Sequence, residues 1–208
     1  MAKKKTKRGR VPFFPNTLKL LAFIFLIFGI VVVLRHGYVP ARYSPFTTVN
    51  LDDPSGWFLD WRIAQLADDR PTCRRILKRP NIMASPVRDR GQRGTCGWTN
   101  AFRVSQAGGA AVAGAPTLEC PEAAAVALWM QHAVQPAAEK FLASRVTRIN
   151  TAGSYNCRNI RGGIGNYFDI LSEHARANAL DVTGFRLANG QTVSVLRDWR
   201  KGGKKAKF

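Results

Sequence analysis

The 208-residue chain is poor in the residues that usually build a metal or catalytic centre. It has only three histidines, His36, His132 and His174, and none of them follows Asp181. Its four cysteines never form a C-x2-C pair, which argues against a structural zinc site made of cysteines. No glycine-rich nucleotide-binding loop and no internal repeat is present. The sequence therefore does not indicate a cysteine zinc module, a nucleotide-binding fold or a repeat array.

Acidic residues are also scarce, because 13 Asp and Glu stand against 32 Lys and Arg, and the net charge is +19. Such a balance favours an anionic partner, but charge alone does not choose among nucleic acid, acidic lipid headgroups and an anionic cell-wall polymer. The basic residues cluster at the two ends, in segments 3–10 and 197–207, and the middle is milder. A nucleic-acid-binding stripe is therefore not required, and nucleic acid is the least favoured partner.

One long uncharged apolar run, LLAFIFLIFGIVVVL over residues 20–34, lies between Lys19 and Arg35. It is slightly shorter than the roughly 20 residues that span a bilayer, but Lys19 can reach the headgroups and let two more residues be buried. We expect an uncleaved transmembrane anchor over residues 18–35. A basic cytoplasmic tail would occupy residues 1–17, with the remainder outside the cytoplasm. The alternative is a cleaved signal peptide, for which residues 39–41 offer only a faint cleavage site.

Residues 36–56 contain three prolines and are interpreted as a linker, and residues 57–208 are long enough for one domain with its own core. The clearest helix begins at Pro121, and Pro136 is expected to kink or divide it before a second helix over 137–144. Shorter helices are expected over 57–66 and 74–78, followed by a loop over 79–97. Strands are expected over 101–104, 146–152, 179–187 and 191–195, the last two joined by the Asn189-Gly190 turn. The predicted fold class is α+β, with one transmembrane helix followed by a small disulfide-containing domain whose helices pack on an antiparallel sheet.

Four cysteines in a translocated domain most simply form two disulfides, and these are Cys73, Cys96, Cys120 and Cys157. Three pairings are possible and the sequence selects none of them; we expect Cys73 with Cys96 and Cys120 with Cys157. Each bridge would stabilise the fold by about 2–4 kcal/mol. The alternatives are free thiols or a zinc cluster.

A histidine and an aspartate stand close together in residues 172–181, which read SEHARANALD. His174 lies in a polar, loop-like run, and Asp181 lies in an apolar run that reads as a strand. Imidazole and carboxylate both suit Zn²⁺, so the two side chains can share one ion. The alternative is a surface histidine and a strand-end aspartate that never meet.

The segments around this pair resemble the bacterial extensin-like C-terminal domain family. They are SYNCRN from Ser154, SEH from Ser172, DVTGF from Asp181, CRRIL from Cys73, CGW from Cys96 and LECPE from Leu118. The resemblance covers roughly residues 55–205. That family is in turn similar to the zinc peptidases typified by D-alanyl-D-alanine carboxypeptidases, lysostaphin and the hedgehog signalling domain, which share the pattern S-x-H-x-x-G-x-A-x-D. This chain keeps Ser172, His174, Ala179 and Asp181, and has Arg176 and Ala177 around the usual glycine.

The resemblance implies that His174 and Asp181 are zinc ligands, that Ser172 supports the ligand loop, and that Arg158 stabilises the oxyanion formed during attack on a carbonyl. A surface arginine beside a disulfide is the equally weighted alternative for Arg158. In the resembled peptidases a later histidine completes the site. The family usually continues to a terminal histidine pair, so this chain is expected to be cut short. His132, on the predicted helix, is expected to be an ordinary helix-surface residue.

The function expected from these observations is that of a single-pass inner-membrane protein with a periplasmic extensin-like domain. It would be a zinc-dependent peptidase, of carboxypeptidase or endopeptidase type, that acts on peptidoglycan peptides. The alternative is a non-catalytic cell-envelope protein that binds peptidoglycan or another anionic envelope polymer and keeps a degenerate metal site.

Overall fold

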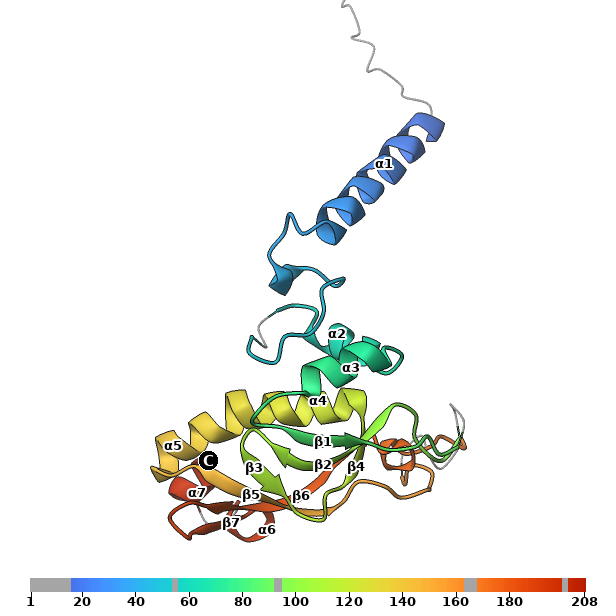
Figure 1. Ribbon diagram of the computed structural model, residues 1–208. Helices are drawn as coiled ribbons and strands as arrows, with labels where there is room; N and C mark the ends of the chain where they lie inside the picture. Colours follow the sequence, from blue (N-terminus) through green and yellow to red (C-terminus); the bar gives the residue numbers. More distant parts are fainter. Residues whose placement is uncertain (1–15, 54–55, 92–94, 163–167, 200–201) are drawn as a thin grey trace, which may run out of the picture.

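The computed structural model describes residues 16–53, 56–91, 95–162, 168–199 and 202–208. The expected basic tail over residues 1–17 therefore lies almost entirely outside the described residues. The first described element is a long helix, α1 (Asn16–Arg35), which extends away from a layered domain formed by the rest of the chain (Figure 1).

α1 is the one helix in the described part of the chain that is long and apolar enough to cross a membrane. Its 20 residues correspond to a length of about 30 Å, which matches the hydrocarbon thickness of a bilayer. None of its residues is buried against the domain. These properties fit a membrane span, and a signal sequence near the N-terminus would share them.

A seven-stranded sheet forms the base of the domain, in the order β1-β2-β3-β5-β6-β7, with β4 also paired to β2. The strands are β1 (Met83–Pro86), β2 (Ala101–Ala107), β3 (Ala110–Val112), β4 (Thr117–Glu119), β5 (Val146–Gly153), β6 (Asp181–Leu187) and β7 (Thr192–Ser194). All neighbouring pairs are antiparallel except β3 and β5, which run parallel. The helices between β3 and β5 make the long crossover that a parallel pair needs. The predicted antiparallel sheet is therefore mixed at this one junction.

A helical rod crosses one face of the sheet (Figure 1). It consists of α4 (Cys120–Trp129), a π-helical turn η2 (Met130–Val134) and α5 (Gln135–Leu142). Its buried side consists largely of alanine, which lets the rod approach the sheet closely. The buried residues include Ala123, Ala124, Ala127, Met130, Val134 and Ala138. Pro136 cannot donate a backbone hydrogen bond, and the wider turn directly before it accommodates this loss. The predicted division at Pro136 therefore appears only as a change of helix type, because α5 starts at Gln135 and the helical backbone continues through the proline.

Two shorter helices, α2 (Leu59–Gln65) and α3 (Arg70–Leu77), lie beside α4. Asp69 caps α3 by accepting a hydrogen bond from the backbone N–H of Thr72 at 3.0 Å. The remaining elements are the 3₁₀ turns η1 (Ala41–Tyr43) and η4 (Glu173–Arg176) and the short helices α6 (Val195–Asp198) and α7 (Lys204–Lys207). β1 falls within the segment predicted as a loop, and that prediction is wrong.

Two disulfides are present, between Cys73 and Cys120 and between Cys96 and Cys157. The expected pairing is therefore wrong. Cys73 lies on the buried side of α3, which packs against the start of α4 where Cys120 stands, and both residues are fully buried. Cys96 lies instead in the loop before β2, and this loop meets the loop after β5 that carries Cys157. Tertiary packing, not nearness in sequence, decides both partners.

Candidate functional site

The structure brings His174 and Asp181 together. His174 lies on η4, and Asp181 is the first residue of β6. The Nε2 atom of His174 is 3.5 Å from Oδ1 of Asp181. The histidine side chain is only 18% exposed, whereas that of the aspartate is 60% exposed. The imidazole is therefore held in place by its surroundings, while the carboxylate stays open to solvent.

Two serines orient the histidine. The Nδ1 atom of His174 lies 3.3 Å from the backbone carbonyl oxygen of Ser154, and the Oγ atom of Ser172 accepts a hydrogen bond from the backbone N–H of His174 at 3.3 Å. Both serines are buried, and the hydroxyl of Ser154 donates to the carbonyl of Thr117 at 2.9 Å. Because a carbonyl only accepts, this contact calls for a proton on Nδ1, and Nε2 is the ring nitrogen that is directed toward Asp181.

The pairing of β5 with β6 places these groups. Gly153, the last residue of β5, stands opposite Asp181 in the sheet. Ser154 follows directly, so its carbonyl and the carboxylate of Asp181 come from neighbouring strands and flank the imidazole. The pairing of the two strands thus brings these groups side by side at the end of the ladder, next to an irregular step in the register between Thr151 and Gly153.

η4 itself is fastened to three different segments. Two of its carbonyl groups and that of Ala177, directly after it, accept hydrogen bonds from the backbone N–H groups of the loop before β2, the loop after β5 and the last residue of β4. The three bonds are Gly97 to Ala175 at 2.9 Å, Asn156 to His174 at 3.0 Å, and Glu119 to Ala177 at 2.9 Å. The Cys96–Cys157 disulfide joins two of these segments. The position of His174 therefore depends on the whole edge of the domain.

Ala177 ends η4 in the left-handed conformation, with φ of 55°, and is fully buried. Counted from Ser172, the glycine of the S-x-H-x-x-G-x-A-x-D pattern falls on this residue with no insertion. A left-handed backbone costs a residue with a Cβ about 1–2 kcal/mol and costs glycine nothing. The chain thus keeps the backbone shape that the pattern's glycine serves, although alanine stands there.

Glu122 is a further acid near the histidine. It lies in the first turn of α4, the helix whose preceding residue, Glu119, is bonded to Ala177. Burial raises the pKa of the Glu122 carboxyl, the nearby charge of His174 opposes that rise, and the nearby Glu173 adds to it. Glu122 therefore adds a second carboxyl group to the surroundings of His174.

The residues beside the histidine have other contacts. The Nη1 atom of Arg158 donates to the carbonyl of Asn159 at 3.3 Å, and the Arg158 carbonyl accepts from the backbone N–H of Ser172. Among the contacts of the described residues, none joins the Arg158 guanidinium to His174 or Asp181. The proposed oxyanion role of Arg158 stays a prediction.

Glu173 and His132 hold local structure together. The Glu173 carboxylate accepts hydrogen bonds from Arg176 at 3.1 Å and from Asn178 at 2.7 Å. The Nε2 atom of His132, on the π turn of the rod, lies 2.7 Å from the carbonyl of Leu51 and ties the segment before α2 to the domain. Within the described ranges, no three His, Cys, Asp or Glu side chains are grouped closely enough to hold a metal ion. The protein donors that meet at this site are therefore His174 and Asp181.

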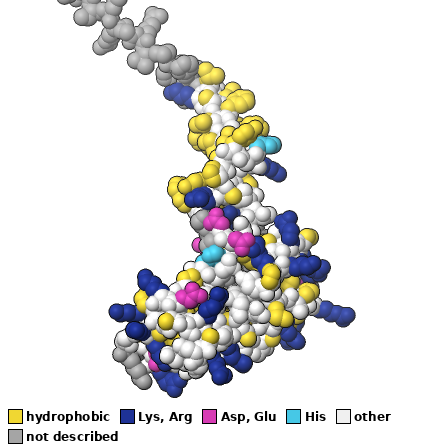
Figure 2. Space-filling model, turned by 60° about the vertical axis from the view of Figure 1, so that its left-hand side comes forward, with side chains coloured by type: hydrophobic (Ala, Val, Ile, Leu, Met, Phe, Trp, Pro, Cys, Tyr) yellow, Lys and Arg dark blue, Asp and Glu magenta, His cyan; other side chains and the backbone are white. Residues whose placement is uncertain are grey.

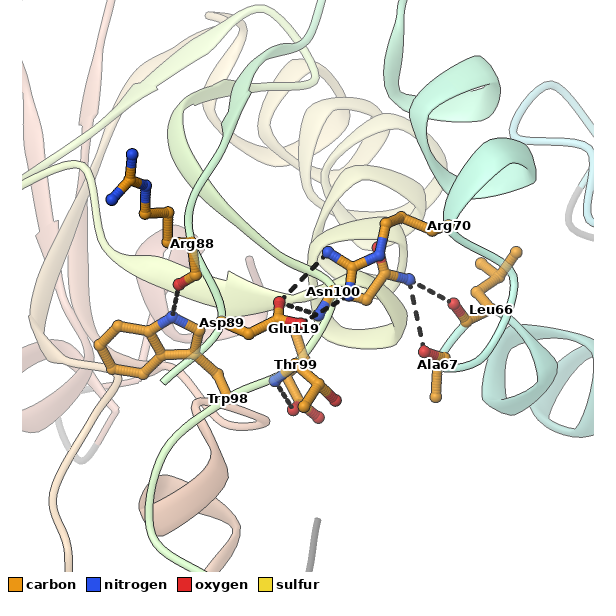
Figure 3. A network of polar contacts seen from close by, with 9 residues as sticks. All are labelled: Leu66, Ala67, Arg70, Arg88, Asp89, Trp98, Thr99, Asn100 and Glu119. Carbon is orange, nitrogen blue, oxygen red and sulfur yellow. Dashed lines mark hydrogen bonds and ion pairs between the residues drawn. The ribbon is translucent and has the colours of Figure 1, made fainter. Parts of the chain in front are cut away.

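A second polar network supports the loop that carries Cys96 (Figure 3). Asp89 accepts from Arg70 at 2.7 Å and from the backbone N–H of Asn100 at 3.1 Å, and these contacts hold the pKa of its carboxyl below the usual value. The Asn100 side chain donates to the carbonyl of Leu66 at 2.8 Å, and Glu119 accepts from the N–H of Thr99 at 2.9 Å. The loop is thereby fixed to α2, α3 and the start of α4.

The fold and this site define an α+β domain with two disulfides and a histidine–aspartate pair at a sheet edge, preceded by one helix long enough to span a membrane. The family described as "Extensin-like protein C-terminus" matches residues 71–208, more than half of the chain. The chain belongs to this family. Neither the curated proteins nor the solved structures show a significant match to it.

Proposed function

We propose that this protein is anchored by α1 in the inner membrane of a bacterial cell and exposes its extensin-like domain to the periplasm. There, His174 and Asp181 would bind Zn²⁺ in a peptidase-like site that acts on peptidoglycan peptides. Family membership and the length and composition of α1 support the anchored extensin-like protein. The geometry of the histidine–aspartate pair supports the metal.

The orientation of the imidazole is the observation that carries the proposal. With its Nδ1 proton directed at the Ser154 carbonyl, a neutral His174 would point the lone pair of Nε2 at the carboxylate oxygen of Asp181, which lies 3.5 Å away. Two facing lone pairs repel each other unless a cation lies between them. Two tetrahedral zinc ligands with bonds of 2.0–2.1 Å are separated by about 3.3 Å, so the pair is spaced as zinc requires. The Ser154 carbonyl is the usual kind of partner for the second nitrogen of a zinc-bound histidine.

Zinc bound here would polarise a scissile carbonyl and activate a water molecule. The chain's own residues would do the rest: Ser154 and Ser172 keep the imidazole fixed, and Asp181, largely exposed, faces the side from which a peptide can approach. Glu122 supplies a carboxyl group in the same surroundings.

The second candidate is a non-catalytic protein that binds peptidoglycan or another anionic envelope polymer. The observation that favours it is that only two protein donors meet in the part of the chain that the structure describes. Two donors hold zinc weakly and leave the remaining positions to water or to groups of a ligand. On this reading the site recognises the polymer without cleaving it.

Zinc content and muropeptide cleavage, measured on the purified full chain, test both candidates. We expect one zinc per chain, lost in His174→Ala and Asp181→Asn. The controls His36→Ala and Asp60→Asn alter exposed residues of the same types and should keep the metal. Cleavage that disappears with the metal establishes the peptidase, and zinc binding without cleavage selects the binding protein. Full zinc content in His174→Ala would refute the site.

A further inference from the structure

Five aromatic side chains lie exposed between α1 and the domain. They are Tyr38, Tyr43, Phe46, Trp57 and Trp61, which we call the juxtamembrane aromatic cluster, and their exposed fractions are 78%, 41%, 54%, 83% and 58%. Figure 2 shows hydrophobic side chains along α1 and again on the segment that joins α1 to the domain. Exposed tryptophan and tyrosine in such numbers require an explanation, because burying them would be strongly favourable.

The segment that carries the cluster is fastened at both ends. The Ser44 hydroxyl donates to the carbonyl of Leu34 in the last turn of α1 at 2.9 Å. The backbone N–H of Trp57 donates to the carbonyl of Arg42 at 3.1 Å, and the rings of Tyr43 and Trp57 meet edge to face with centroids 5.5 Å apart. The segment that the sequence suggested was a linker therefore folds back on itself and brings Trp57 beside the residues that follow α1.

A buried arginine closes this arrangement. Arg62, on α2, is only 5% exposed, and its guanidinium donates to the carbonyl of Ala41 at 3.4 Å and to the hydroxyl of Thr47 at 3.3 Å. Gly56 adopts φ of 144°, and a Cβ there would lie 2.6 Å from the Arg42 carbonyl and 2.7 Å from the Arg62 guanidinium. The contact is thus tight, and α2, with Trp61 on it, is held against the segment directly after α1.

We infer that the juxtamembrane aromatic cluster is a membrane-docking surface, which lies in the interfacial layer of the bilayer that α1 enters. This inference rests on the proposed membrane anchoring. α1 is about as long as the hydrocarbon layer is thick, so the residues after Arg35 emerge among the headgroups. Tyrosine and tryptophan favour that layer because each has an apolar ring and a polar atom. The bilayer is the occupant because α1 leads directly to the cluster and the Arg62 contacts keep α2 beside it.

Quenching of tryptophan emission by lipids measures this docking in the full chain, reconstituted into vesicles whose acyl chains are brominated close to the headgroup. Three variants each keep one tryptophan, with phenylalanine at the other four positions: Trp57 alone, Trp61 alone, and Trp199 alone. Trp199 is the matched control, since it is 76% exposed and directly follows α6, at the end of the domain away from α1 (Figure 1). Vesicles without bromine give the reference emission.

We expect the brominated lipid to reduce the emission of Trp57 and Trp61 and to leave that of Trp199 unchanged. Flotation of each variant with the vesicles after an alkaline wash reports separately on the anchor. Flotation with unquenched Trp57 and Trp61 overturns the docking surface and leaves the anchored protein intact. Loss of flotation overturns the anchor, and the docking surface with it. Equal quenching of all three tryptophans also contradicts the proposal, because the whole domain would then lie on the lipid.

Discussion

Removing the Cys73–Cys120 disulfide should destabilise the domain more than removing the Cys96–Cys157 disulfide. The bridge joins the buried side of α3 to the first residue of α4, and both cysteines are completely buried. The perturbation is the double substitution Cys73→Ala and Cys120→Ala. The matched comparison is Cys96→Ala with Cys157→Ala, because Cys157 is exposed and Cys96 is half-buried.

The loop lengths give the magnitude. The two bridges span 47 and 61 residues. The chain-entropy relation gives about 4 kcal/mol for either loop at 25 °C, so entropy does not distinguish them. Burial does distinguish them, because deleting the two sulfur atoms of the fully buried Cys73 and Cys120 leaves a cavity in the core, whereas Cys96 is half-buried and Cys157 is exposed. We expect a loss of at least about 4 kcal/mol for the buried pair and a smaller loss for the exposed pair.

Urea unfolding followed by circular dichroism measures both losses, and alkylation of the single variant Cys73→Ala tests the connectivity. Without a reductant, the thiol that reacts in Cys73→Ala after denaturation should be Cys120. Labelling of Cys96 instead would show that Cys73 pairs with Cys96, and the reasoning from the α3–α4 contact would be refuted. Equal losses in the two double variants would refute the contribution of burial.

Two further changes test the site and the segment before the domain. Burial raises the pKa of the Glu122 carboxyl above its ordinary value of 4.5. The stability that this group contributes is therefore fully present below its unfolded-state pKa and is lost as the pH rises through its folded-state pKa. In Glu122→Gln, the free energy of unfolding should therefore decrease less with rising pH over that range than in the unaltered protein. Urea unfolding of the metal-free protein at several pH values measures this dependence, and an unchanged pH slope would contradict the prediction. Arg62→Met should remove the guanidinium's hydrogen bonds to the Ala41 carbonyl and the Thr47 hydroxyl, cost about 1–3 kcal/mol and speed proteolysis of residues 41–58. The exposed control Arg74→Met should digest like the unaltered protein, and equal rates in all three would show that Arg62 does not hold the segment.

Local signals in the sequence predicted the elements that such signals govern. Prolines and tight turns fix the backbone geometry of only a few residues. The sequence contains such signals at Pro121, Pro136 and Asn189-Gly190, and the helix start, the change of helix type and the hairpin are present at these positions. The helix α1 could be predicted from the length of its apolar run and the absence of charge within that run. Family membership followed from short segments around the cysteines and the histidine, and the matched region agrees with it.

The features that depend on contacts between distant residues could not be predicted from the sequence. β1 has mostly exposed residues and ends at Pro86, so neither alternation nor apolar content indicated a strand; its pairing with β2 makes it one. The disulfide partners follow from the packing of α3 on α4, which no spacing between cysteines encodes. Glu122 stands in the first turn of a helix, where an acid is favourable for local reasons alone. Its nearness to His174 depends on the hydrogen bond between Glu119 and Ala177, which are far apart in the sequence.

The decisive physical question at the site is which cation lies between His174 and Asp181. If a proton occupies Nε2, the two side chains form an ion pair, and the imidazolium donates to both Asp181 and the Ser154 carbonyl. If zinc occupies the position, the ring is neutral and only its Nδ1 proton remains. The two states differ in what Asp181→Asn does: an amide can still accept from a protonated ring, but it is a poor zinc ligand. An Asp181→Asn variant that keeps its fold but loses bound zinc would therefore point to the metal. If neither the fold nor the zinc content changes, zinc does not lie between these two side chains.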